Sequence, residues 1–136
     1  MNKYTYALPL RWADADAYGH VNNALFLTYM EEARTRMFQE MLPNDEAEAR
    51  RHAFVVGRSI VDYRAPLLYR EEPVEVQVWV ARARAATLEL GYAIRDAERT
   101  YAEATITLAA YNLDSGRPRR LSDGEKEFLA RYTEEA

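Results

Sequence analysis

The sequence predicts an α+β domain in which one long helix packs on one antiparallel sheet. Three observations support this: an amphipathic segment near the N-terminus, several later segments with alternating apolar residues, and short connections between those segments. A helix with a wide apolar stripe needs a sheet face to cover it. At 136 residues the chain has the size of one ordinary domain, so we expect a single domain over residues 1–136.

The first two elements are a strand and the long helix. Residues 4–12 alternate and carry aromatic side chains, and Pro9 fits an edge or the end of a strand. From residue 24 to residue 41 the larger apolar residues recur at spacings of three and four, which predicts a helix. Asn22 or Asn23 is a good N-cap, and Pro43 with the asparagine after it marks the end of the helix.

The remaining elements are mainly strands. Residues 44–52 form a polar connection or a short second helix, and Ser122 with Glu125 forms a capping box that begins a terminal helix. Because the connections are short, we expect the later strands to be antiparallel neighbours in a meander. Alternation predicts these strands over residues 54–65, 72–82, 88–94 and 101–112.

Composition excludes several classes of function. Cys is absent, so a thiolate nucleophile and a cysteine metal site are excluded, and the net charge of −4 argues against general nucleic-acid binding. No apolar run approaches the roughly 20 residues that cross a bilayer, and the N-terminus lacks the apolar centre of a signal peptide. We therefore expect a cytoplasmic protein with no membrane or nucleic-acid partner.

Common catalytic and metal-binding motifs are incomplete. Residues 57–61 nearly match a G-x-S-x-G elbow but end in Val61 and lie in an alternating strand. Asp14 and Asp16 begin like a calcium loop, but Leu25 stands where the closing Glu belongs. With two histidines and no glycine-rich phosphate loop, the sequence predicts no metal and no cofactor. Either carboxylate chemistry or no chemistry remains.

The stretch DADAYGHVNN, residues 14–23, combines a carboxylate with a helix start. Gly19 permits a tight turn, and the unpaired amides at a helix N-terminus suit an oxyanion. Asp16, with a reference pKa of about 3.9, could attack a carbonyl or deprotonate a water that does. The alternative interpretation is that these Asp and Asn residues serve only as helix caps.

The longer run RWADADAYGHVNNALFLTYMEEAR resembles the signature of the hotdog-fold acyl-CoA thioesterases of the 4-hydroxybenzoyl-CoA thioesterase type. The segments YRAPLLYREEPVEVQVWV and LDSGRPRRLSD are similar to later parts of the same family. The resemblance implies a hotdog fold: a long central helix wrapped by an antiparallel sheet of about five strands, with a short C-terminal helix. It also implies hydrolysis of an acyl-CoA or acyl carrier protein thioester.

The resemblance also implies roles for residues. Asp16 matches the catalytic carboxylate, the amide that polarises the carbonyl falls on or next to Asn23, and His20 supports them in the catalytic group. Glu31 matches the glutamate of the E-x-A-R element and is the alternative catalyst. The implied substrate-binding residues are Gly19, Val21, Phe26 and Arg64. The helix residues expected to face the acyl group are Leu25, Phe26, Tyr29 and Met30.

The family resemblance further implies a homodimer or homotetramer with sheets joined edge to edge, and residues 72–82 would fit the joining edge. Arginines would meet the coenzyme A phosphates. The candidates are Arg58, Arg64, Arg82, Arg84, Arg117, Arg119 and Arg120. Two rival functions remain: a hotdog dehydratase of 3-hydroxyacyl thioesters that uses His20, and a non-catalytic acyl-CoA-binding module.

Overall fold

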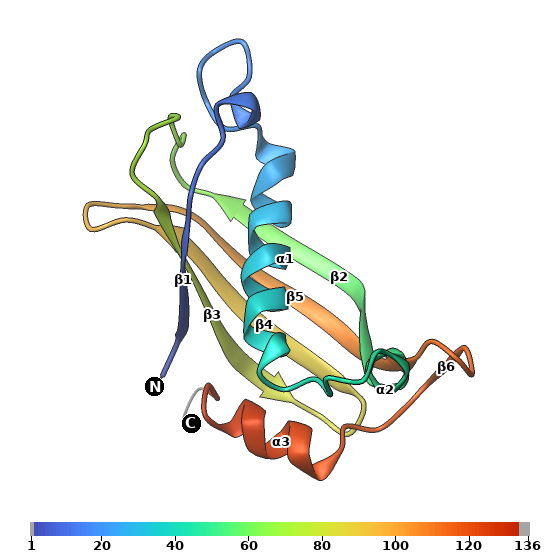
Figure 1. Ribbon diagram of the computed structural model, residues 1–136. Coiled ribbons are helices and arrows are strands. Elements are labelled where there is room, and N and C mark those ends of the chain that lie inside the picture. Colours follow the sequence, from blue (N-terminus) through green and yellow to red (C-terminus); the bar gives the residue numbers. More distant parts are fainter. Residues whose placement is uncertain (1, 134–136) are drawn as a thin grey trace.

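The structure is a computed structural model that describes residues 2–133 (Figure 1). A short 3₁₀ helix, Trp12–Asp14, follows the first strand. The α-helices are α1 (Asn23–Gln39), α2 (Glu46–Arg51) and α3 (Asp123–Ala130). The strands are β1 (Tyr4–Leu8), β2 (Ala53–Tyr63), β3 (Val74–Ala83), β4 (Thr87–Arg95), β5 (Thr100–Asn112) and β6 (Arg117–Pro118).

The strands form one antiparallel sheet in the order β1-β3-β4-β5-β2, and β6 pairs with β5. The long helix α1 lies across one face of this sheet, and α3 lies at the end of the molecule opposite the N-terminus of α1 (Figure 1). The predicted α+β architecture is confirmed, including the long helix on the sheet and the short C-terminal helix.

The position of β2 differs from the prediction. Only β3, β4 and β5 form the expected meander, because β2 pairs with β5 at the edge of the sheet. The connection between β2 and β3 spans residues 64–73 and contains two prolines, which is too long for a tight hairpin. The expectation that residues 72–82 form the joining edge is wrong, since β3 lies between β1 and β4.

Alternation and helical periodicity explain the core between α1 and the sheet. On α1, Met30, Ala33 and Met37 are completely buried. On β3 the valines at alternate positions are buried, while Glu75 and Gln77 are only partly covered. The helix begins where an asparagine cap was expected, since the Asn22 side chain accepts a hydrogen bond from Ala24 N at 2.9 Å.

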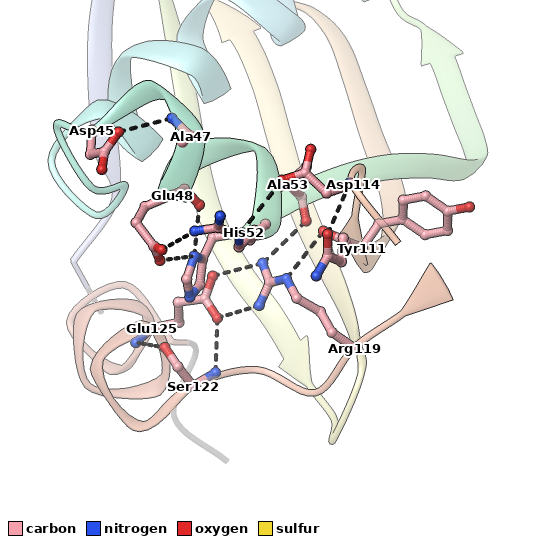
Figure 2. A network of polar contacts seen from close by, with 12 residues as sticks. Asp45, Ala47, Glu48, His52, Ala53, Tyr111, Asp114, Arg119, Ser122 and Glu125 are labelled. Atoms are coloured by element: carbon pink, nitrogen blue, oxygen red, sulfur yellow. Dashed lines mark hydrogen bonds and ion pairs between the residues drawn. The ribbon is translucent and has the colours of Figure 1, made fainter. Parts of the chain in front are cut away.

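A polar network closes the end of the molecule where α2, β6 and α3 meet (Figure 2). The Arg119 guanidinium donates to both carboxylate oxygens of Glu125, at 2.7 and 2.9 Å, and to Ala53 O at 3.1 Å. Ser122 and Glu125 form the predicted capping box. This network joins the C-terminal segment to the start of β2.

Candidate functional site

The candidate site lies at the N-terminal end of α1, in the loop that precedes the helix. Asp16 N donates to His20 O at 2.7 Å, and Gly19 N donates to Asp16 O at 3.0 Å. Gly19 has a φ of 79°, which glycine adopts without steric cost. The turn expected at Gly19 is therefore present, and it brings Asp16 back toward the helix start.

The two carboxylate oxygens of Asp16 have different surroundings. Oδ1 accepts hydrogen bonds from the backbone N–H groups of Tyr18, at 2.9 Å, and His20, at 3.3 Å. Within residues 2–133, Oδ2 has no hydrogen-bond partner. The side chain is exposed, so one oxygen fixes the carboxylate while the other is available for chemistry.

The first amides of α1 are paired, with one exception. Asn22 N donates to Asp14 O at 3.1 Å, and Leu25 N donates to Asn22 O at 2.9 Å. Ala24 N donates to the Asn22 side chain. Among the residues that the structure describes, Asn23 N has no acceptor. This amide is the free donor of the helix start.

Asp16 and Asn23 line the same cavity, of about 270 Å³. A free carboxylate oxygen and a free helix amide on one cavity can act on opposite sides of a carbonyl carbon. The lining residues are Asp16, His20, Val21, Asn22, Asn23, Phe26, Pro66 and Leu67. Five residues from the sequence-based site set, Asp16, His20, Val21, Asn23 and Phe26, are therefore brought together.

Two other members of that set lie elsewhere. Gly19 makes the turn but does not line the cavity. Arg64 forms an ion pair with Glu103 at 3.3 Å, and its side chain is also outside the lining.

The helix residues expected to face an acyl group separate into different environments. Phe26 lines the cavity, but Leu25 lines a different cavity. Met30 is completely buried in the core. The Tyr29 hydroxyl donates to Asp14 Oδ2 at 2.7 Å. Three of the four therefore do not line this cavity. Leu25 lies on a different face of the helix from Phe26, and Tyr29 and Met30 share the face of Phe26 but lie one turn farther along the helix.

Glu31, the alternative catalyst, belongs to a second cavity of about 510 Å³ between α1, α2 and the start of β2. It lies eight residues after Asn23, about 12 Å along the helix axis. Arg34 lines the same second cavity and donates to the Tyr92 hydroxyl at 2.9 Å. Within one chain, Glu31 is therefore too distant to share a carbonyl with the Asn23 amide.

Several arginines considered for phosphate binding have protein partners. Arg119 is occupied by Glu125 and backbone carbonyls. Arg82 lies 3.9 Å from a carboxylate oxygen of Glu89.

Sequence reasoning missed the contribution of the β2–β3 connection. Pro66 and Leu67 form one wall of the site cavity. Leu67 O accepts from Val21 N at 2.7 Å, and Gly19 O accepts from Tyr69 N at 3.4 Å. The available signal was the family-like YRAPL segment, which drew attention to Arg64 and not to the residues after it.

Residues 2–133 contain neither a metal-binding cluster of side chains nor a membrane-spanning helix. No group of three or more His, Asp or Glu side chains is arranged to hold a metal ion. No helix there combines the length and apolar character needed to cross a bilayer.

Comparison with known proteins gives consistent relatives. The family model described as the thioesterase-like superfamily matches residues 10–131. The chain is 31% identical over 125 residues to the acyl-CoA thioester hydrolase YbgC of Escherichia coli, covering 89% of this chain and 92% of that protein.

Solved structures agree. A thioesterase from Thermus thermophilus, crystallised with coenzyme A and Zn, is 34% identical, with a TM-score of 0.78, and the match covers 92% of this chain and 95% of that one. A predicted thioesterase from Bacillus stearothermophilus has a TM-score of 0.88 at 23% identity and covers 99% of both chains, which shows a shared fold.

Proposed function

This chain belongs to the thioesterase-like superfamily, and from that premise we propose that it hydrolyses acyl-CoA thioesters with Asp16 and the helix start at Asn23. The products are a free carboxylic acid and coenzyme A. The assignment rests on one observation. Asp16, whose Oδ2 has no hydrogen-bond partner, and Asn23, whose N–H has no acceptor, line the same cavity.

In the proposed reaction, the thioester carbonyl oxygen accepts a hydrogen bond from Asn23 N. Negative charge develops on that oxygen as the carbonyl carbon is attacked, and the positive end of the helix dipole stabilises it. Removing one such donor from an oxyanion site costs about 100-fold or more in rate. His20 lines the same cavity and shapes the space beside the carbonyl.

Asp16 has two chemically distinct roles open to it. As a general base, Oδ2 removes a proton from a water that attacks the carbonyl carbon, and the thiolate of coenzyme A leaves. As a nucleophile, Oδ2 attacks the carbon itself, expels the thiolate and forms a mixed anhydride that water then cleaves. Single turnover in ¹⁸O-labelled water distinguishes them, because only the anhydride route can place the label in the Asp16 carboxylate.

The proposed assembly is a homo-oligomer built on the β2 edge. Asp16 and Asn23 are solvent-exposed in one chain, whereas electrostatic stabilisation of an oxyanion is stronger where water is excluded. The adjacent edge strand β2 is 11 residues long and exposes Val56 and Ile60 to about half their area. A long apolar edge of this kind is a template for pairing with another strand. A second copy would therefore cover both the edge and the site.

We propose that the acyl group of the substrate is carried by coenzyme A. One relative is named an acyl-CoA thioester hydrolase, and another was crystallised with coenzyme A. The test is thiol release from a panel of short, medium, long and aryl acyl-CoAs, read with a disulfide dye. The chain has no Cys and contributes no background. Release from at least one member supports the proposal.

Other outcomes separate the alternatives. A dehydratase would convert a 3-hydroxyacyl-CoA to the enoyl product without releasing thiol. A non-catalytic module would bind acyl-CoA without turnover. Either result would overturn the hydrolase assignment for coenzyme A substrates.

A further inference from the structure

A second acid near the site, Asp14, is buried although Asp16 is exposed. Only 6% of Asp14 is accessible, and it ends the short 3₁₀ helix two residues before Asp16. Burying a carboxylate is costly unless it is hydrogen-bonded or paired. The roles assigned above to Asp16, His20 and Asn23 do not use it.

Asp14 accepts three hydrogen bonds, two of which come from α1 and its N-cap. Its Oδ2 accepts from the Tyr29 hydroxyl at 2.7 Å, and its Oδ1 accepts from Arg11 Nε at 3.2 Å. Its backbone carbonyl accepts from Asn22 N at 3.1 Å. One residue thus holds both the N-cap of α1 and a side chain on the second turn of that helix.

Tyr29 is suited to remain a hydrogen-bond donor in this position. The residue is 5% accessible. Burial raises the pKa of its hydroxyl well above the ordinary range, and the hydrogen bond to Asp14 and the charge of that carboxylate raise the pKa further. The hydroxyl therefore keeps its proton throughout the neutral and moderately alkaline range.

We propose that Asp14 and Tyr29 form a positioning pair that sets the distance between the Asp16 carboxylate and the Asn23 amide. This inference rests on the function proposed above. Asp16 follows Asp14 by two residues, and Asn23 follows the Asn22 amide that Asp14 holds. Movement of Asp14 relative to α1 therefore changes the placement of both reacting groups at once.

The deletion of one hydroxyl tests the pair. Tyr29→Phe removes the hydrogen bond and keeps the ring that stacks beside Phe26. Misplacement by about 1 Å can cost up to about 100-fold in rate. We expect kcat to fall about tenfold while KM changes less than about twofold, because Tyr29 does not line the cavity that holds the substrate.

A double-mutant cycle shows whether the two residues act as one unit. Asp14→Asn keeps an oxygen acceptor for Tyr29 and is expected to retain more activity than Asp14→Ala. Adding Tyr29→Phe to Asp14→Ala should lower kcat no further. Additive losses, or a native kcat in Tyr29→Phe, would contradict the proposal.

The matched control is Tyr92→Phe. Tyr92 is also buried and its hydroxyl also has one hydrogen-bond partner, Arg34, but it lies on β4 away from the loop. We expect this variant to lose stability and keep its kcat. An equal fall in kcat in both variants would assign the effect of Tyr29 to general stability and overturn the proposal.

A readout independent of turnover separates this inference from the proposed function. Hydrogen exchange of the Asn22 amide should become at least about tenfold faster in Tyr29→Phe and stay native in Tyr92→Phe, because opening of the loop exposes that amide. Unchanged exchange would contradict the positioning pair. Exchange of the Asn22 amide could become faster in Tyr29→Phe while Asp16→Asn keeps the native rate of thiol release. In that case Asp14 and Tyr29 anchor the loop, and the proposed catalytic role of Asp16 is wrong.

Discussion

One carboxylate oxygen of Asp16 accepts two N–H groups of its own loop, the other has no hydrogen-bond partner within residues 2–133, and the residue lines the cavity. This division explains how a carboxylate on an exposed turn can be held in one orientation while its other oxygen stays free for the proposed chemistry. The Asn23 amide is distinguished in the same way, because its neighbours in the first turn all have acceptors. The proposed chemistry depends on these two atoms.

A residue-scale prediction concerns Gly91 on β4. A Cβ at this position would lie 2.3 Å from the Trp79 indole, which covers it from the paired position on β3. We expect Gly91→Ala to lower the free energy of unfolding by about 1 kcal/mol, the lower end of the cost of overpacking, because the partly buried Trp79 indole must shift to admit the methyl group. Urea denaturation measures the change.

The matched control is Gly124→Ala on α3, where an added Cβ meets nothing within 4 Å. This variant should be as stable as the native chain or more stable by about 0.5 kcal/mol, because alanine favours a helix. If Gly91→Ala were equally well tolerated, the close contact with Trp79 would not constrain the sheet.

For individual residues, the sequence predicted which side chains line the cavity better than it predicted the contacts that fix their positions. Residues 14–23 are contiguous, and a loop before a helix must place them together. The Tyr29–Asp14 contact joins residues that are 15 apart, and periodicity alone shows only that Tyr29 is buried. Pro66 and Leu67 come from a distant loop whose path follows from tertiary packing.

Among the five longer strands, β2 has the largest share of exposed residues. Six consecutive residues of the strand are exposed, and one of its sides has no neighbouring strand in the described chain. Isolated apolar edge strands favour association. The same strand runs beside α1, where the Tyr63 hydroxyl donates to Asn23 O at 3.2 Å. Pairing at this edge would therefore affect the helix start directly.

An element-scale prediction follows for Ile60, which is 49% accessible. We expect the native chain to sediment as a dimer or larger species and Ile60→Glu to sediment as a single chain at micromolar concentration. A charge at a pairing edge resists burial in an interface. Analytical ultracentrifugation measures the mass of the assembly. Thiol release should be lower in the single-chain Ile60→Glu variant than in the native protein.

The control substitution is Leu113→Glu, which changes an equally exposed leucine, at 42%, just after β5. It should leave the assembly unchanged. A native chain that sediments as a monomer, or an Ile60→Glu variant that keeps the native mass, would contradict the β2 interface.

Element boundaries were predicted well where a local signal exists. The Asn cap and the S-x-x-E capping box begin α1 and α3 as expected. Strand neighbours were harder to predict. The short β3–β4 and β4–β5 turns specify pairing, whereas the long connection after β2 leaves its partner open. The wrong assignment of β3 as the joining edge rested on its length and polar alternation, which do not reveal that β1 pairs with it.

Across the whole molecule, polar networks lie at both ends. Asp14 joins the loop to α1 at the end with the candidate site, and Arg119 with Glu125 joins the C-terminal segment to the start of β2 at the other end (Figure 2). Burial works to raise the pKa of Glu125, but the hydrogen bond from Arg119 and the Ser122 backbone amide outweigh it and hold the pKa below its usual range. Folding therefore favours the ionised form.

The sign of the pH dependence follows from that lowered pKa. The stabilisation by ionised Glu125 is fully present above its unfolded pKa, near 4.5, and is lost as the pH falls through the lower folded pKa. We expect Glu125→Gln to be less stable than the native chain by about 3 kcal/mol at pH 7, because Arg119 loses its buried partner. The difference should shrink below about pH 4.

Urea denaturation at several pH values between 7 and 3 measures this difference. Glu127→Gln makes the same chemical change at an exposed position of α3 and should stay within about 0.5 kcal/mol of native. A Glu125→Gln difference that stays constant into the acid range would contradict the lowered pKa.

The α+β class followed from two periodicities, the three- and four-residue spacing of α1 and the alternation of the strands. Both periodicities reflect burial on one face, which a single chain can reveal. The assembly and the placement of the site relative to a second copy depend on surfaces between chains. Nothing in the periodicity of one chain specifies them.

Asp16→Asn shows whether the Asp16 carboxylate carries out the hydrolysis. The amide keeps the shape and the Oδ1 acceptor but removes the negative charge, so kcat for the best acyl-CoA should fall at least about 100-fold. Asp123→Asn, at an exposed position at the start of α3, should keep the native rate. A folded Asp16→Asn variant that releases thiol at the native rate would exclude Asp16 as the catalytic carboxylate and direct attention to Glu31.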